Sequence, residues 1–241
     1  MSTSLPHSGK IAVVTGASRG IGRAIALGLA RAGAQVIAVA RTQGALEALD
    51  DEILAETGRR ATLVPLDLRK PEELDVLGRA LYDRFGRVDI VVHAGAVLGP
   101  ISPAGHVEPK HWDEAIGVNL TATWRLIRSF EPLLKASDAG RAIFVTTGRV
   151  ARPKAFWSPY AASKAGMEAL VKCWADELEQ TKVRAVLLDP GAMRTKMRAQ
   201  AFPGEDPMTL PEPEAIVPLV IDLAGREELP AMPETVVFKA G

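Results

Sequence analysis

The sequence contains a single cysteine, few aromatic residues and no excess of charge of either sign. Because Cys173 is alone, no disulfide can form within the chain, which favours a reducing compartment, and we expect this thiol to be packed. Aromatic residues make up only 5% of the chain, so the core should be aliphatic and rich in alanine. The 29 basic residues balance the 29 acidic ones, so no overall field would attract nucleic acid or an anionic membrane. Neither is expected as a partner.

Long apolar runs are also missing. The first ten residues hold no apolar segment of the secretory type, and no stretch of about twenty apolar residues occurs. We therefore expect a cytoplasmic protein. With 241 residues, 47% of them apolar, the chain fits one domain over 1–241, and no linker rich in glycine, proline or serine divides it.

Short apolar runs alternate with longer segments of helical periodicity along the chain. Most of the short runs are apolar throughout, as parallel strands buried on both faces should be. The alternation predicts an α/β fold of the doubly wound Rossmann type, with about seven parallel strands and helices on both faces. The predicted strands are 11–14, 35–40, 61–66, 90–93, 142–146, 184–188 and 236–238. The predicted helices are 20–32, 44–57, 71–85, 109–135, 159–180 and 213–224.

A glycine-rich turn follows the first predicted strand. Residues 15–22 read Thr-Gly-Ala-Ser-Arg-Gly-Ile-Gly and open an amphipathic helix. Glycine lets the backbone approach a pyrophosphate closely, and the free N–H groups at the helix start favour its negative charge. The turn therefore predicts a dinucleotide-binding loop, with an ordinary tight turn as the alternative.

The end of the second predicted strand bears on which dinucleotide is bound. An acid there would bind the adenosine ribose hydroxyls and repel a 2′-phosphate, but the chain has Ala40 followed by Arg41. The fold would bring Arg41 and Arg19 towards the same ribose, where a guanidinium can bind phosphate with two hydrogen bonds. We expect NADP(H) rather than NAD(H), unless both arginines are only solvated surface groups.

Tyr160 and Lys164 form a candidate proton-handling pair. They lie four residues apart at the start of a predicted helix and so project from one face. Hydride addition to a carbonyl leaves negative charge on oxygen, which requires a proton donor. A nearby ammonium group would lower the pKa of the tyrosine. The only other tyrosine, Tyr82, has no such neighbour.

Together the Gly-x-x-x-Gly-x-Gly loop and the Tyr-x-x-x-Lys pair resemble those of the short-chain dehydrogenase/reductase family, over nearly the whole chain. The resemblance implies an NADP(H)-dependent oxidoreductase that transfers hydride between nicotinamide and a carbonyl compound or secondary alcohol. It implies catalytic roles for Asn119, Thr147, Tyr160 and Lys164. It implies that the cofactor also contacts Tyr160 and Lys164 and is bound by Gly16, Ser18, Arg19, Gly20, Ile21, Gly22, Arg41, Asp67, Leu68, Ala94, Gly95, Pro190, Gly191, Met193 and Thr195.

The chain departs from the family pattern at two positions. His93 stands before Ala94 where the family usually has asparagine, and we expect it to be structural. Thr147 stands thirteen positions before Tyr160 where the family has serine. It keeps the hydroxyl but adds a methyl group, and Thr146 is the alternative donor. These departures leave open a non-catalytic cofactor-binding regulatory or scaffold protein. An epimerase or dehydratase would need further acid–base groups, for which His93 is the one candidate.

The substrate should enter over the carboxyl ends of the strands and be covered by a proline-rich, irregular loop at about 195–213, with room for one short helix. The side chains that could reach it favour an anionic or partly apolar carbonyl compound: Arg149, Arg152, Phe156, Trp157, Arg194, Met197, Arg198 and Phe202. The four histidines are scattered and indicate no metal site.

The two longest predicted helices carry apolar residues on more than one face. These residues include Trp124, Leu126, Ile127, Met167, Leu170 and Trp174. One sheet can cover only one face of a helix, and the resemblance implies that the other faces pair across a two-fold axis. We expect a homodimer or homotetramer.

Overall fold

The computed structural model describes residues 5–239, and in this range seven parallel strands form one sheet in the order β3-β2-β1-β4-β5-β6-β7. Residues 1–4 and 240–241, on which the expectations about the N-terminal segment and the domain ends partly rest, lie outside the described residues. The strands are β1 (Ile11–Thr15), β2 (Gln35–Ala40), β3 (Thr62–Pro65), β4 (Ile90–His93), β5 (Arg141–Val145), β6 (Arg184–Asp189) and β7 (Thr235–Val237).

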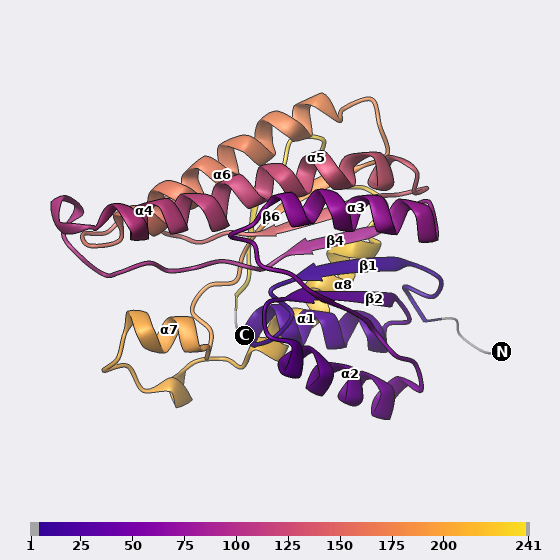
Figure 1. The fold of residues 1–241 in the computed structure, drawn as a ribbon, viewed down its shortest axis with the longest axis horizontal. Coiled ribbons are helices and arrows are strands. Elements are labelled where there is room, and N and C mark those ends of the chain that lie inside the picture. The colour runs from indigo at the N-terminus through magenta and orange to yellow at the C-terminus, as the bar shows by residue number, and fades with distance from the viewer. Residues whose placement is uncertain (1–4, 240–241) are drawn as a thin grey trace.

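Helices cover both faces of the sheet, with α3 to α6 on one face and α1, α2 and α8 on the other (Figure 1). Their bounds are α1 (Gly20–Arg31), α2 (Gln43–Thr57), α3 (Glu72–Phe85), α4 (Pro109–Ile116), α5 (Ala122–Lys135), α6 (Ser158–Glu177), α7 (Lys196–Ala201) and α8 (Val217–Gly225). The predicted class is thereby confirmed as one Rossmann-like α/β domain. No helix within residues 5–239 combines the length and the apolar character needed to cross a bilayer.

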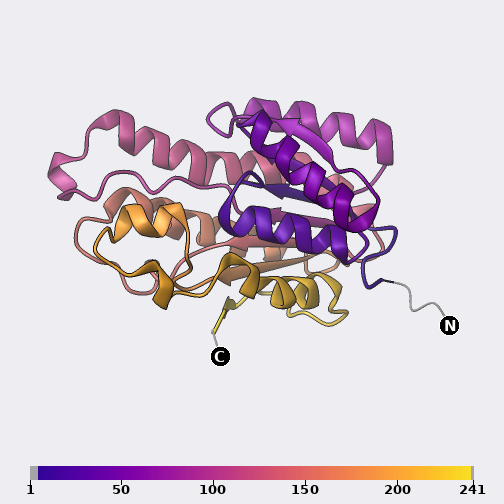
Figure 2. The same ribbon diagram turned by 90° about the horizontal axis from the view of Figure 1, so that it is seen from below.

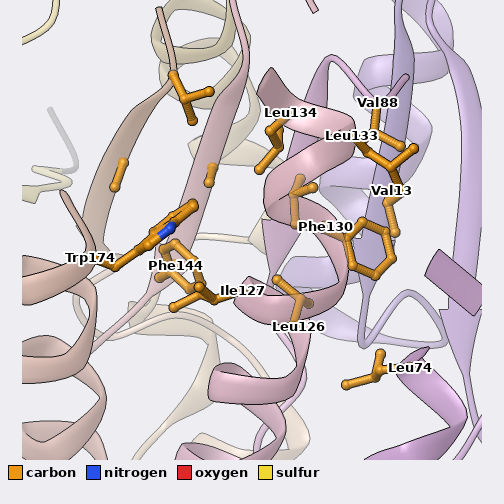
Figure 3. Packing of buried hydrophobic residues seen from close by; sticks show 14 of the residues in the cluster. Val13, Leu74, Val88, Leu126, Ile127, Phe130, Leu133, Leu134, Phe144 and Trp174 are labelled. Atoms are coloured by element: carbon orange, nitrogen blue, oxygen red, sulfur yellow. The ribbon is translucent and has the colours of Figure 1, made fainter. Parts of the chain in front are cut away.

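Two apolar cores, one on each face, hold these layers together. On the α3 to α6 face, Phe130 of α5 packs towards Val13 of β1, while Trp174 of α6 meets Phe144 of β5 (Figure 3). The rings of Phe144 and Trp174 are edge to face, with centroids 6.1 Å apart. Burying an aromatic side chain of this kind contributes about 1.5 to 3 kcal/mol. This packing fixes α5 and α6 on the sheet and, with them, the residues that they carry.

The strand order reverses at β1, which places a crevice at the carboxyl end of the sheet. β1 pairs with β2 on one side and with β4 on the other. After β3 the chain therefore passes back over β2 and β1 to form β4 on the far side of β1. Connections after β1 and β4 therefore diverge to opposite faces, and ligands bind at such switch points in open α/β sheets. Thr15 and His93, the last residues of β1 and β4, are paired at this point.

One predicted segment differs from the structure, and another agrees with it. The predicted helix 109–135 is divided by a π-helical turn, Gly117–Thr121, between α4 and α5. The predicted loop 195–213 contains the one short helix that was expected, α7, together with a 3₁₀ turn, Pro207–Thr209. Both views place α7 beyond the carboxyl ends of the strands (Figure 1; Figure 2).

Cys173 is exposed on α6, so the expectation of a packed thiol was wrong. The reason is helical phase: Trp174 and Val171, its neighbours along α6, turn towards the core and are buried. Cys173 therefore faces outward on the same helix.

Candidate active site

The glycine-rich turn between β1 and α1 is packed closely against the end of β4. Gly16 has a φ of +73°, and a Cβ placed on it would lie 2.7 Å from the backbone nitrogen of Gly95. A Cβ on Gly22 would lie 2.4 Å from the carbonyl oxygen of Gly16. Only glycine fits this loop, and the first N–H groups of α1, which begins at Gly20, open onto it. A pyrophosphate fits such a bare backbone at a helix start.

A cavity of about 730 Å³ extends from this loop to α7. Its volume is that of a pocket for a cofactor-sized ligand. Every residue that the sequence assigned to cofactor binding lines it, and so do Thr147, Tyr160 and Lys164. Asn119 does not line it, and its side chain is fully buried.

One end of the cavity is cationic. Arg19 and Arg41 both line it, and none of the ion pairs within residues 5–239 involves either residue. Asp67 lies nearby and accepts hydrogen bonds from the backbone and guanidinium of Arg69. The Arg69 guanidinium lowers the pKa of Asp67, with a smaller contribution from the charge of Arg41. Two arginines therefore remain available to an anion at this end.

The other end holds Tyr160 and Lys164, both buried one turn apart near the start of α6. Lys164 Nζ donates to the carbonyl oxygen of Val145 at 2.7 Å. Burial lowers the pKa of Lys164 to about 8, and the charge of Glu168 opposes this shift. Burial raises the pKa of Tyr160 to about 12, and an interaction with the Thr147 hydroxyl opposes this shift.

The expected lowering of the Tyr160 pKa by Lys164 is therefore not found in this arrangement. The ammonium group of Lys164 is held by the end of β5, and desolvation of the phenolate outweighs the other effects on Tyr160. Consequently Tyr160 is protonated at neutral pH, which is the state that a proton donor requires.

Thr146 and Thr147 both line the cavity, and Thr147 is the one whose hydroxyl interacts with Tyr160. Thr146 Oγ1 donates to the buried carboxylate of Glu168 at 2.6 Å and is therefore occupied. Thr147 Oγ1 accepts from the backbone N–H of Arg149 at 3.3 Å, which leaves its own proton for an oxygen beside Tyr160. Glu168 was not among the site residues predicted from the sequence. The one feature of the sequence that could have indicated it is its position: Glu168 follows Lys164 by four residues and so lies on the same, buried face of α6.

Asn119 lies in the π-helical turn and joins three segments. Its Nδ2 donates to the carbonyl oxygen of Val97 and to Ser163 Oγ, both at 2.9 Å, and its Oδ1 accepts from the Val97 N–H at 2.9 Å. Thr123 Oγ1 donates to the Asn119 carbonyl oxygen at 2.9 Å. The side chain thus ties the chain after β4 to α6, next to Lys164.

His93 lies fully buried beneath this site. Its Nδ1 is 2.8 Å from Thr15 Oγ1, which also accepts the Gly95 N–H at 3.3 Å. The imidazole therefore braces the ends of β1 and β4, as a structural residue would, and it does not line the cavity. Its Nε2 has no hydrogen-bond partner within the described residues.

The segment after β6 closes the cavity on a further side. Asp189 Oδ1 accepts from the Gly191 N–H at 3.0 Å and fixes the Pro190-Gly191 turn. Thr195 caps α7 by accepting from the Arg198 N–H at 3.1 Å. A Cβ on Gly20 would lie 3.4 Å from Thr195 Cγ2, so Thr195 lies beside the glycine loop.

Within residues 5–239 no three His, Cys, Asp or Glu side chains are grouped as a metal ion would require.

A nucleotide-binding loop and a buried tyrosine–lysine pair thus share one cavity, and comparison with known proteins agrees with this arrangement. The family model for short chain dehydrogenases matches residues 10–206. The chain belongs to the short-chain dehydrogenase/reductase family. The resemblance inferred from the sequence is confirmed, and the protein is a member of a family of oxidoreductases.

Three proteins similar to this short-chain dehydrogenase are informative. The oxidoreductase YciK of Escherichia coli K12, named as uncharacterized, is 38% identical over 90% of this chain and 86% of its own. The solved short chain dehydrogenase of Escherichia coli CFT073 in complex with NADPH has a TM-score of 0.92 and 36% identity, covering 97% and 98% of the two chains. A Mycobacterium tuberculosis oxidoreductase named as NAD-dependent is 34% identical over 78% of this chain and 73% of its own.

Proposed function

We propose that this short-chain dehydrogenase/reductase transfers hydride between NADP(H) and a carbonyl compound or secondary alcohol. The observation that carries the proposal is the shared cavity of about 730 Å³, which joins the glycine loop to Tyr160, Lys164 and Thr147. A scaffold protein that only bound the nucleotide would have no need for a protonated phenol and a free hydroxyl at the inner end.

Three side chains carry the proposed chemistry. Tyr160, protonated at neutral pH, donates a proton to the oxygen that gains charge when a carbonyl is reduced. The Thr147 hydroxyl donates a hydrogen bond to the same oxygen and so stabilises the negative charge on it. Lys164, with a pKa of about 8, keeps a positive charge beside them at neutral pH. When bound, the nicotinamide cofactor supplies the hydride.

The preference for NADP(H) rests on the cationic end of the cavity. Arg41 follows β2 where an acid would select NAD(H), and Arg19 lies in the glycine loop. Two guanidinium groups without acidic partners suit a 2′-phosphate. The relatives include one in complex with NADPH and one named for NAD, so the preference is argued from these two arginines.

Three further expectations belong to the same proposal. The segment 195–213 with α7 covers the substrate end, since Met197, Arg198 and Ala201 line the cavity. The protein forms a homodimer or homotetramer through the outer faces of its long helices. A cytoplasmic location, expected from the lack of long apolar runs and consistent with the single cysteine, would give it access to a reducing nucleotide pool.

Oxidation of NADPH against a panel of ketones, aldehydes and quinones, compared with NADH, tests the proposal. Tyr160→Phe should lower kcat for any reduced carbonyl by about 100-fold or more, because a positioned general acid contributes that much, while NADPH fluorescence reports unchanged binding. Tyr82→Phe is the matched control, because Tyr82 is 58% exposed on α3.

Full activity in Tyr160→Phe would contradict the role given to the phenol. Tight binding of NADPH without turnover on any compound would instead support the non-catalytic alternative. Faster turnover with NADH than with NADPH would overturn the cofactor preference.

A further inference from the structure

The substrate end of the cavity has an aromatic wall that begins at Tyr160. The ring of Trp157 meets that of Tyr160 edge to face, with centroids 6.0 Å apart, and the ring of Phe202, which does not itself line the cavity, packs against Trp157 with centroids 5.6 Å apart. Leu98 is buried with Trp157 and Tyr160, and Met197 packs against them. A molecule whose reacting oxygen meets Tyr160 would therefore lay an apolar portion along this wall.

Arg149 stands over this wall. Its guanidinium carbon lies 5.2 Å from the centroid of the Trp157 ring, and its backbone N–H is bonded to Thr147 Oγ1. The residue is half-buried and lines the cavity. None of the ion pairs among residues 5–239 includes it. A stacked guanidinium without an acidic partner keeps its hydrogen-bonding edge free.

The other cations near this end are accounted for. Arg194 is paired with Glu212, and Arg198 forms a bidentate pair with Glu205. Lys196 is exposed and follows Thr195, which lies beside the glycine loop, so it belongs to the phosphate end. Among the cavity-lining cations of the described residues, Arg149 thus lacks an ion-pair partner at the substrate end, as Lys164 does at the reacting end. Lys154, over the Phe202 ring, is also without an ion pair in this range but does not line the cavity.

Asp189, which also lines the cavity, places a negative charge near Tyr160, opposite in sign to that of Arg149. Its Oδ2 lies 3.1 Å from the position of a Cβ on Gly148, at the floor of the cavity, and its charge raises the pKa of Tyr160 further. A substrate anion close to Asp189 would be repelled by its carboxylate. The same anion beside Trp157 would be attracted by Arg149.

We propose that Arg149 selects the substrate of this enzyme: an aldehyde or ketone that carries a carboxylate, separated from the carbonyl by an apolar, preferably aromatic, portion. The carbonyl meets Tyr160 and Thr147, the apolar portion lies on Trp157, and the carboxylate accepts hydrogen bonds from the guanidinium. The planar fork of arginine suits the two oxygens of a carboxylate. This inference rests on the proposed function, since it names the substrate class of the same site.

Binding of a carboxylate that cannot react tests this inference without turnover. Calorimetry with naphthoate in the presence of NADP⁺ should show binding to the wild type and to Arg152→Gln. The dissociation constant for Arg149→Gln should be higher by about tenfold or more, as expected for the loss of a charge-assisted hydrogen bond. Arg152 is the control because it is exposed on the same loop and does not line the cavity. Arg149→Lys keeps the charge and should recover part of the affinity.

Turnover is measured beside binding with para-formylbenzoate and its neutral methyl ester. The wild type should prefer the acid by about tenfold in kcat/KM, and Arg149→Gln should lose this preference while keeping its rate with the ester. Equal binding of naphthoate and the neutral naphthamide, no binding of naphthoate, or loss of binding also in Arg152→Gln would overturn the inference. Binding that depends on Arg149, without reduction of either aldehyde, would instead contradict the proposed reaction.

Discussion

The charge state of His93 shows how one buried residue can couple this site to stability. Burial lowers the pKa of His93 from 6.5 to about 3, and the charge of Lys164 adds to the shift. In the unfolded chain the imidazole takes up a proton below its ordinary pKa of about 6.5, whereas in the folded chain it stays neutral. Protonation therefore favours the unfolded state, so the stability due to neutral His93 is complete above pH 6.5 and is lost as the pH falls towards 3.

His93→Asn, which restores the residue usual in the family, should remove this dependence. Between about pH 7 and about pH 4.5 the wild type should lose about 2 to 3 kcal/mol of unfolding free energy more than the variant, because one group is involved. Urea unfolding at the two pH values measures the difference. His7, whose pKa is also lowered by burial, is present in both proteins and cancels. Parallel losses in both proteins would show that His93 is not the group responsible.

At the scale of elements, the sequence predicted what depends on composition and local pattern. The apolar runs located the strands, and the spacing of Tyr160 and Lys164 placed the pair in one turn of helix. The apolar periodicity does not show the π-helical turn at Asn119, because it continues through the turn, and only the family resemblance implied a bent helix there. The cause of the turn is tertiary: bonds to Val97 and Ser163. The Thr146–Glu168 bond was missed for the same reason, since its partners are 22 residues apart.

The pKa of Tyr160 could not be predicted from spacing either. The sequence shows that an ammonium group is one turn away, but not that Lys164 turns to the Val145 carbonyl or that the phenol is buried. Likewise α7 is a helix of six residues between prolines, and it depends on the Thr195 cap and on the pairing of Arg198 with Glu205. Such short helices gain their stability from tertiary contacts and not from propensity.

The contact between α1 and α8 allows a test of packing at this scale. Replacing a helical glycine by alanine ordinarily stabilises a helix by about 1 kcal/mol. A Cβ on Gly28, however, would lie 2.2 Å from Cγ1 of Val217, a stiff side chain at the start of α8. Overpacking of this kind costs about 1 to 3 kcal/mol, and the gain from helix propensity offsets about 1 kcal/mol of it, so Gly28→Ala should lower the unfolding free energy by up to about 2 kcal/mol.

Gly44→Ala is the matched control, because nothing lies within 4 Å of a Cβ at that position in α2. It should leave urea unfolding unchanged or slightly stabilise the chain. Val217→Ala in the Gly28→Ala background should recover part of the loss, as expected for residues in contact. A Gly28→Ala protein as stable as Gly44→Ala would mean that α8 can shift away from α1 without loss of stability.

At the scale of the whole molecule, the apolar residues that suggested an oligomer divide into two groups. Leu126, Ile127, Met167 and Trp174 are buried within this chain and leave nothing for a partner. Trp124, in contrast, is 44% exposed on α5, and Leu170 is partly buried against the core. The outer face of α6 is also exposed in one chain and carries a row of small side chains at helical spacing, Ala162, Ala165, Ala169 and Cys173, beside the charged Lys172 and Asp176. Small side chains let a second helix approach closely.

A charge on this face should therefore break the proposed assembly without unfolding the chain. In a two-fold assembly the same face of α6 is used by both chains, so that α6 packs on α6 of the partner. Ala169→Arg would therefore introduce two like charges into one interface. Like charges brought together at an interface cost several kcal/mol, so the dissociation constant should rise by about 100-fold or more. Sedimentation equilibrium would show a shift from dimer or tetramer to a smaller species, with an unchanged circular dichroism spectrum. Val76→Arg adds the same charge on α3, where Val76 is 71% exposed, and should leave the mass unchanged. A monomeric wild type, or an Ala169→Arg protein of wild-type mass, would show that the outer face of α6 is not an interface and that it stays in contact with solvent.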